Sequence, residues 1–185
     1  PYPYPQITVV VVPFNAGEAG GMEYPTLITT WSNLHPSDDP GFSIGTTIHE
    51  FGHQYWYGML ASNEFEEPWL DEGINTYGTG LLMDRIGSRI RVTFHPILGY
   101  PLEFNWPMIG QFDLYRGAAM MGVQSPLVSS TWQFQDGGDY SQSSYARSAA
   151  TLKTLELYLG EETMGHVMRT YARRFAFHHP DSEDF

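Results

Sequence analysis

Two histidines four residues apart carry the clearest chemistry in this sequence. The segment His49-Glu50-Phe51-Gly52-His53 has the pattern H-E-x-x-H. On an α-helix, residues at this spacing lie on one face about one turn apart, so two imidazoles can reach one zinc ion. Glu50 then lies beside the metal, where it can act on a water molecule. The alternative interpretation is two histidines and a solvated glutamate on a helix surface.

A catalytic zinc ion needs a third protein ligand and one open position for water. Glu72 follows His53 after 18 intervening residues, within the sequence P-W-L-D-E-G at residues 68–73. Pro68 suits the first turn of a helix, and Asp71 and Glu72 are favoured near the positive end of its dipole. A second helix can therefore offer Glu72 to the metal, and we expect Asp71 to have a local structural role only.

Four motifs of this chain resemble those of one peptidase family and occur in the same order along the sequence. H-E-x-x-H, followed after 18 residues by the glutamate of W-L-D-E-G, resembles the gluzincin metallopeptidases, in particular the M1 aminopeptidase family. The sequence G-G-M-E-Y at residues 20–24 resembles that family's exopeptidase loop, G-[AG]-M-E-N, with Tyr24 in place of asparagine. The sequence Y-A-R at residues 145–147 resembles its Y-x-[KR] element.

The resemblance implies a role for each reacting group. One zinc ion per chain would be held by His49, His53 and Glu72. Glu50 would take a proton from the attacking water and later deliver it to the leaving nitrogen. Tyr145 would donate a hydrogen bond to the oxyanion of the tetrahedral intermediate.

The exopeptidase loop implies a substrate class, namely peptides with a free amino terminus. Its carboxylate would be the counter-charge of the amino-terminal ammonium, and its glycines permit close backbone approach. If the loop leads into an edge strand, a substrate peptide could pair with it as an added strand. The alternative is an ordinary exposed glutamate in a loop. The expected substrate-binding residues of this loop are Gly20, Gly21, Met22 and Glu23.

These residues need a small sheet and several helices to position them, and the resemblance implies such a fold. It is α+β, a thermolysin-like metallopeptidase catalytic domain with a small N-terminal β-sheet followed by a mainly helical lobe. Hydrophobic periodicity and capping residues predict the elements. These are a buried strand at Gln6–Val12, a strand within Tyr24–Trp31, a helix capped by Ser43 and ending at Leu60, a helix from Pro68 to Gly87, a helix capped by Ser143 or Ser144 and ending at Leu159, with Leu152, Leu155 and Leu159 in the core, and a helix from Glu161 to Arg174.

Composition bounds the remaining possibilities. A chain of 185 residues with 42% hydrophobic and 15% aromatic content suits one folded domain. A net charge of −12 with nine basic residues argues against nucleic-acid binding, and no apolar run is long enough for a membrane span. Without cysteine, neither disulfides nor thiolate ligands are available, which suits an exported and a cytosolic chain alike.

The resemblance also implies that residues 1–185 are a catalytic domain cut from a larger multidomain protein. Family members carry a β-rich domain before this domain and further domains after it, so flanking domains are expected partners. Two other functions are compatible with the motifs: another gluzincin hydrolase, such as an endopeptidase or an epoxide hydrolase, and a non-catalytic scaffold that retains the fold. The presence of every expected ligand and of Glu50 argues against the scaffold.

Overall fold

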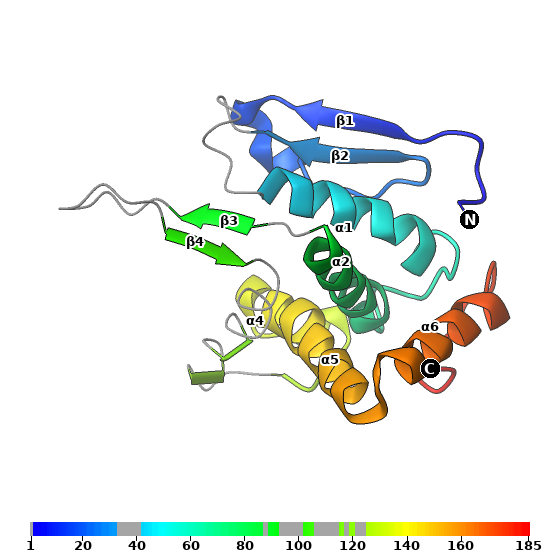
Figure 1. The fold of residues 1–185 in the computed structure, drawn as a ribbon. Coiled ribbons are helices and arrows are strands. Elements are labelled where there is room, and N and C mark those ends of the chain that lie inside the picture. The colour runs from blue at the N-terminus through cyan, green and yellow to red at the C-terminus, as the bar shows by residue number, and fades with distance from the viewer. Residues whose placement is uncertain are drawn as a thin grey trace.

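The computed structural model describes residues 2–32, 42–86, 89–92, 102–105, 115–116, 119–120 and 125–185. A two-stranded sheet lies over helix α1, and α2 separates α1 from a lobe formed by α5 and α6 (Figure 1). The strands are β1 (Thr8–Val12), β2 (Leu27–Trp31), β3 (Arg89–Val92) and β4 (Leu102–Asn105). The helices are α1 (Phe42–Trp56), α2 (Ile74–Arg85), α4 (Gly137–Ser141), α5 (Ser148–Leu159) and α6 (Glu161–Arg174), with 3₁₀ segments η1 (Phe14–Ala19) and η4 (Thr131–Gln133) and π-helical segments η3 (Trp69–Gly73) and η5 (Gln142–Arg147). The predicted α+β fold is confirmed.

The first sheet has two parallel strands, with Thr8 of β1 opposite Leu27 of β2. The prediction of a buried first strand is wrong, because Val9 and Val11 are 46% and 56% exposed. Helix α1 packs against β2, and among the described residues β1 gains cover only at Val12. A run of β-branched residues therefore forms a strand here without forming core.

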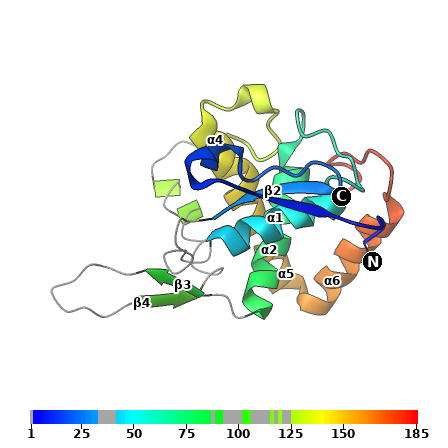
Figure 2. The ribbon, with the colours of Figure 1, turned by 90° about the horizontal axis from the view of Figure 1, so that it is seen from above.

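The second sheet is an antiparallel pair, β3 with β4, which extends away from the helical body (Figure 2). It lies in a stretch of sequence with weak periodicity. No helix among the described residues is long and apolar enough to cross a membrane.

Helix α1 begins and ends differently from the prediction. It starts at Phe42, so Ser43 lies inside the first turn, and the Ser43 carbonyl accepts a hydrogen bond of 2.7 Å from the Thr47 hydroxyl. The predicted Ser43 cap is therefore wrong. The helix ends at Trp56 rather than at Leu60. The chain turns after Trp56, and Leu60 is buried in the core.

The helix predicted to begin at Ser143 or Ser144 starts earlier. Segments α4, η5 and α5 follow one another without a break, and Asp136 is the cap, because its side chain accepts from the Asp139 amide. Both serines are fully buried inside the π-helical segment, so the predicted cap is wrong.

The core lies between α2, α5 and α6. Of the predicted α5 stripe only Leu152 is buried, whereas Leu155 and Leu159 are each 37% exposed, and Leu155 faces an open hollow. The last helix is confirmed as α6, Glu161–Arg174. The core cluster consists of Leu60, Trp69, Leu70, Ile74, Tyr77, Ala149, Leu152, Met164, Met168 and Tyr171.

Candidate metal centre

Helices α1 and α2 approach closely at a glycine. A Cβ atom added to Gly52 would lie 1.9 Å from Oδ1 of Asn75. Asn75 is 1% exposed and donates from Nδ2 to the carbonyl of His49 at 2.7 Å. This contact fixes α2 against the turn of α1 that carries the two histidines. Sequence reasoning did not identify Asn75, although a polar residue in the apolar stripe of a helix was the available signal.

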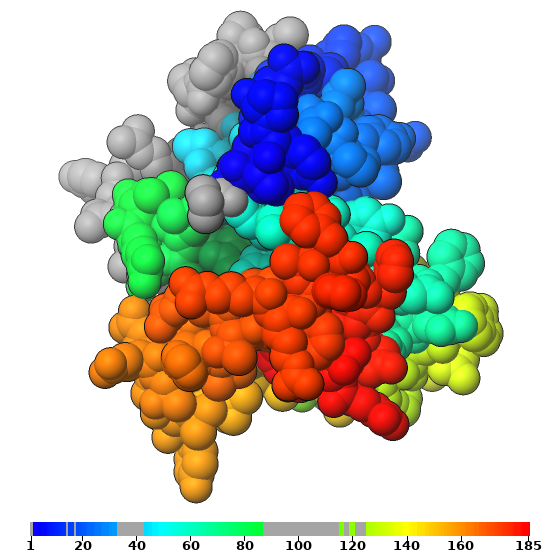
Figure 3. Space-filling view, turned by 90° about the vertical axis from the view of Figure 1, so that its right-hand side faces the viewer, coloured from blue at the N-terminus to red at the C-terminus, as the bar shows by residue number. Residues whose placement is uncertain are grey.

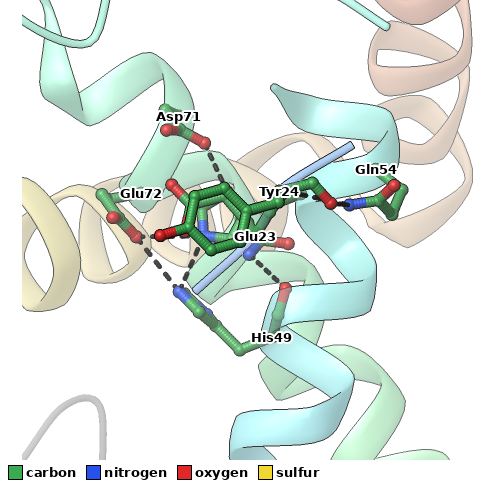
Figure 4. Close-up of polar contacts among 8 residues, drawn as sticks. Glu23, Tyr24, His49, Gln54, Asp71 and Glu72 are labelled. Atoms are coloured by element: carbon green, nitrogen blue, oxygen red, sulfur yellow. Dashed lines mark hydrogen bonds and ion pairs between the residues drawn. The ribbon is translucent and has the colours of Figure 1, made fainter. Parts of the chain in front are cut away.

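The three expected ligands converge at one point, where His49 and Glu72 point toward each other (Figure 4). Nε2 of His49 lies 3.1 Å from Oε2 of Glu72 and 3.1 Å from Nε2 of His53, which lies 3.3 Å from the same oxygen. Around a tetrahedral zinc ion with bonds of about 2.0–2.1 Å, ligand atoms are about 3.3 Å apart. The two nitrogens and one oxygen therefore fit a zinc ion in both type and spacing.

The π-helical segment η3 presents two consecutive carboxylates to one imidazole. Glu72 faces Nε2 of His53, and Asp71 accepts a hydrogen bond from Nδ1 of the same ring. Asp71 is fully buried and His53 is 1% exposed. A carboxylate on the second nitrogen fixes the orientation and tautomer of a metal-binding histidine. The structural role expected of Asp71 thus takes a specific form, which the sequence pattern did not predict.

The charges at this point are strongly coupled. Burial lowers the pKa of His53, but the hydrogen bonds and charges of Asp71 and Glu72 raise it more, to about 11. Burial raises the pKa of Glu72, but hydrogen bonds from His49 and His53 lower it more, to about 2. Without a metal, a proton on His53 therefore neutralises part of the carboxylate charge, and a cation must replace that proton to bind.

Glu50 lies beside this group and keeps a free carboxylate. It is 5% exposed, and no donor among the described residues reaches its side chain. Burial raises its pKa to about 8, while His53 lowers the pKa and Glu23 raises it. A carboxyl group with a pKa near neutrality can both accept and return a proton, as a general base and acid must.

The glycine-rich loop pairs with the edge of β2 that β1 leaves open. The amide of Gly21 donates to the Thr29 carbonyl at 3.1 Å, and the Thr29 amide donates to the Met22 carbonyl at 2.9 Å. Gly20 is half-buried, and Met22 is 38% exposed. The positive φ of Gly21, 82°, suits glycine, and its Cα approaches the site closely, since an added Cβ would lie 3.4 Å from Glu50 Oε1.

Gln54 holds this loop over the metal centre. It is 1% exposed and donates from Nε2 to the Glu23 carbonyl at 3.1 Å (Figure 4). Its Oε1 accepts from the Thr26 amide at 2.8 Å. The Glu23 carboxylate is thereby brought within 4.8 Å of ligand atoms of both Glu50 and His53. Glu23 is 8% exposed, so the alternative of an exposed loop glutamate is wrong. Gln54 directly follows the H-E-x-x-H motif, which is the signal that could have identified it.

Tyr145 reaches the same point from η5. Its ring stacks on His49, with centroids 5.8 Å apart and planes at 20°, and its hydroxyl is close enough to feel the charge of Glu72. Burial and the charge of Glu72 raise its pKa far above the ordinary value, so the group stays a phenol that can donate. Segments η3 and η5 meet at Gly73, where an added Cβ would lie 2.8 Å from the carbonyl oxygen of Ser144.

Two adjoining helices with two histidines, a glutamate and a free carboxylate at one point define the class of H-E-x-x-H metallohydrolases. The sequence model of the family described as "Peptidase family M1 domain" matches residues 1–185. The chain belongs to peptidase family M1, and the family predicted from the motifs is confirmed.

Similar proteins agree with this assignment. Aminopeptidase M1-C of Oryza sativa subsp. japonica is 26% identical and Aminopeptidase M1 of Arabidopsis thaliana is 25% identical, each over the whole chain. The chain spans about 20% of the length of these relatives. A mutant M1 zinc metallopeptidase of Deinococcus radiodurans, solved with a Tyr-Ser-Ala substrate, has the same fold. It has a TM-score of 0.66 and 21% identity, over 100% of this chain and 35% of that one.

Proposed function

We propose that residues 1–185 form the catalytic domain of a zinc-dependent aminopeptidase, which releases single residues from the free amino terminus of peptides. The observation that carries this proposal is the position of Glu23. Its buried carboxylate lies within 4.8 Å of ligand atoms of Glu50 and His53, next to the site expected to hold the metal. A carboxylate there can bind an ammonium one residue before the bond that is cut, which selects amino termini over internal positions.

The chain's own residues account for the proton transfers. When held by His49, His53 and Glu72, zinc supplies a Lewis acid that makes water more acidic and polarises a carbonyl group. Glu50 accepts a proton as the water oxygen bonds to the scissile carbonyl carbon. As the carbon–nitrogen bond breaks, Glu50 returns this proton to the leaving amine. The Tyr145 phenol donates a hydrogen bond to the carbonyl oxygen while negative charge develops there.

The proposal is tested with matched peptides and metal analysis. Zinc-loaded protein should release the first residue of an unblocked peptide, lose this activity with a chelator, and regain it when zinc is returned. The same peptide with an acetylated amino terminus should be cleaved far more slowly. Equal cleavage of both peptides, or cuts at internal bonds, would assign the site to an endopeptidase instead. A folded protein that takes up no zinc would refute the metal site itself.

The parent protein is proposed to hold further domains around this one. The relatives named above are much longer than this chain, and flanking domains could complete the cleft that receives the peptide. Turnover by residues 1–185 is therefore compared with turnover by the longest available form of the protein. A similar rate for both would show that the described residues suffice.

A further inference from the structure

Glu23 belongs to two groups of close side chains. The first is formed with Glu50 and His53, and the second with Glu64 and Asp71; in each group one ligand atom of every residue lies within 4.8 Å of the others. Glu64 comes from the acidic connection between α1 and η3. It has no part in the proton transfers described above, and the motifs gave it no role.

A well-bonded turn holds the backbone of Glu64 in place. The side chain of Asn63 accepts a hydrogen bond from the Phe65 amide at 3.1 Å, and the Phe65 carbonyl accepts from the amide and the hydroxyl of Thr131 at 2.9 and 3.0 Å. The Glu67 carboxylate accepts from a backbone amide of the C-terminal segment. This segment, red in Figure 3, lies against the cyan-green region that follows α1. The half-buried Glu64 is therefore presented from a fixed support.

The second group contains buried oxygens that lack a donor. Asp71 is fully buried, and although its Oδ1 accepts from His53, its Oδ2 has no hydrogen-bond partner. Glu23 is 8% exposed, and no donor among the described residues reaches its carboxylate. The ion pairs of Arg85 with Glu161 and of Lys153 with Glu156 lie away from this group. Buried acceptors without donors are costly, so the group is suited to a ligand that brings positive charge and several donors.

We propose that Glu64 is a specificity-determining residue, which binds the amino-terminal ammonium of the peptide together with Glu23, with Asp71 as the buried third carboxylate. This inference rests on the proposed aminopeptidase function. An ammonium has three N–H donors, and bonds of about 2.8 Å at tetrahedral angles place their acceptors about 4.6 Å apart. Oxygens within 4.8 Å of one another can all be reached by one such group. A neutral, acetylated terminus lacks these donors and leaves the carboxylates unpaired.

The test compares Glu64→Gln with Glu66→Gln, a matched control in the same turn whose side chain is exposed. For an unblocked peptide, Glu64→Gln should raise KM by about 10- to 100-fold, the size of one charge-assisted hydrogen bond, with kcat nearly unchanged. Glu66→Gln should leave both constants at the wild-type values. A des-amino analogue, in which hydrogen replaces the ammonium, should inhibit wild type and Glu64→Gln equally. All variants should bind one zinc ion per chain.

Three results would overturn the inference. The first is an unchanged KM in Glu64→Gln, and the second is an equal loss of affinity for the des-amino analogue, which would mean that Glu64 only shapes the cleft. The third is a second metal ion bound by wild type and lost from Glu64→Gln. If the wild type releases no residue, the proposed function fails separately. Calorimetric binding of the unblocked peptide to zinc-loaded Glu50→Gln, with and without Glu64→Gln, then still tests Glu64.

Discussion

Replacing Gly52 with alanine should damage the metal centre without altering any ligand. The added Cβ would lie 1.9 Å from Oδ1 and 3.0 Å from Cγ of Asn75, so the Asn75 side chain must move by about an ångström. Asn75 is 1% exposed and cannot move outward without losing its 2.7 Å hydrogen bond to the His49 carbonyl. Overpacking costs about 1–3 kcal/mol, and a buried group left unpaired costs about 1–3 kcal/mol more. We therefore expect the free energy of unfolding to fall by about 2–6 kcal/mol.

The same displacement should weaken zinc binding. Zinc sites tolerate deviations of about 0.2 Å in ligand distance. The contact between Gly52 and Asn75 sets the separation between α1, which carries His49, and α2, which follows Glu72. We expect at least a tenfold loss of zinc affinity, measured by competition with a chromophoric chelator. Urea unfolding of the metal-free protein gives the stability. Gly137→Ala is the control, since it is also helical and its added Cβ meets nothing within 4 Å.

A double variant separates this explanation from a general intolerance of alanine. Asn75→Ala removes the atoms that the new methyl group meets, so Gly52→Ala combined with Asn75→Ala should be more stable than the sum of the two single losses predicts. If the two losses add without coupling, the contact between these residues is not the cause. Wild-type stability and zinc affinity in Gly52→Ala would refute the argument altogether.

Three further predictions concern the reacting groups. Glu50→Gln should retain zinc and lose about 100- to 10,000-fold in kcat. Because burial raises the pKa of Glu50 to about 8, its ionisation destabilises the metal-free wild type as the pH rises. Calorimetry of the metal-free proteins should therefore show Glu50→Gln becoming more stable relative to wild type between pH 4.5 and 8. Tyr145→Phe should lower kcat about 100- to 1,000-fold at unchanged zinc content by metal analysis. Because Asp71 and Glu72 raise the pKa of His53 to about 11, zinc must displace a proton, and chelator competition from pH 6 to 8 should show affinity rising about tenfold per pH unit.

The sequence predicted the meeting of His49, His53 and Glu72 better than it predicted the burial of the elements around them. The four-residue spacing of His49 and His53 places both imidazoles on one helix face wherever that helix packs, so local geometry alone predicts the pair. The assignment of Glu72 as the third ligand depended on the resemblance, because the local sequence does not show that its helix packs against the helix with the histidines. Val9 to Val11 show the opposite case: β-branched residues indicate a strand, but burial depends on which other elements cover it.

The two π-helical segments were beyond prediction for a related reason. In a regular α-helix successive side chains point about 100° apart, yet the consecutive residues Asp71 and Glu72 address the two nitrogens of one ring, His53. A π turn contains more residues, which reduces the angle between neighbours and lets both carboxylates face α1. Such a turn persists where tertiary contacts favour it, as at Gly73, where only a residue without Cβ allows η3 to touch η5. The π turn therefore depends on the tertiary contact at Gly73, and the helix propensities of single residues contain no information about that contact.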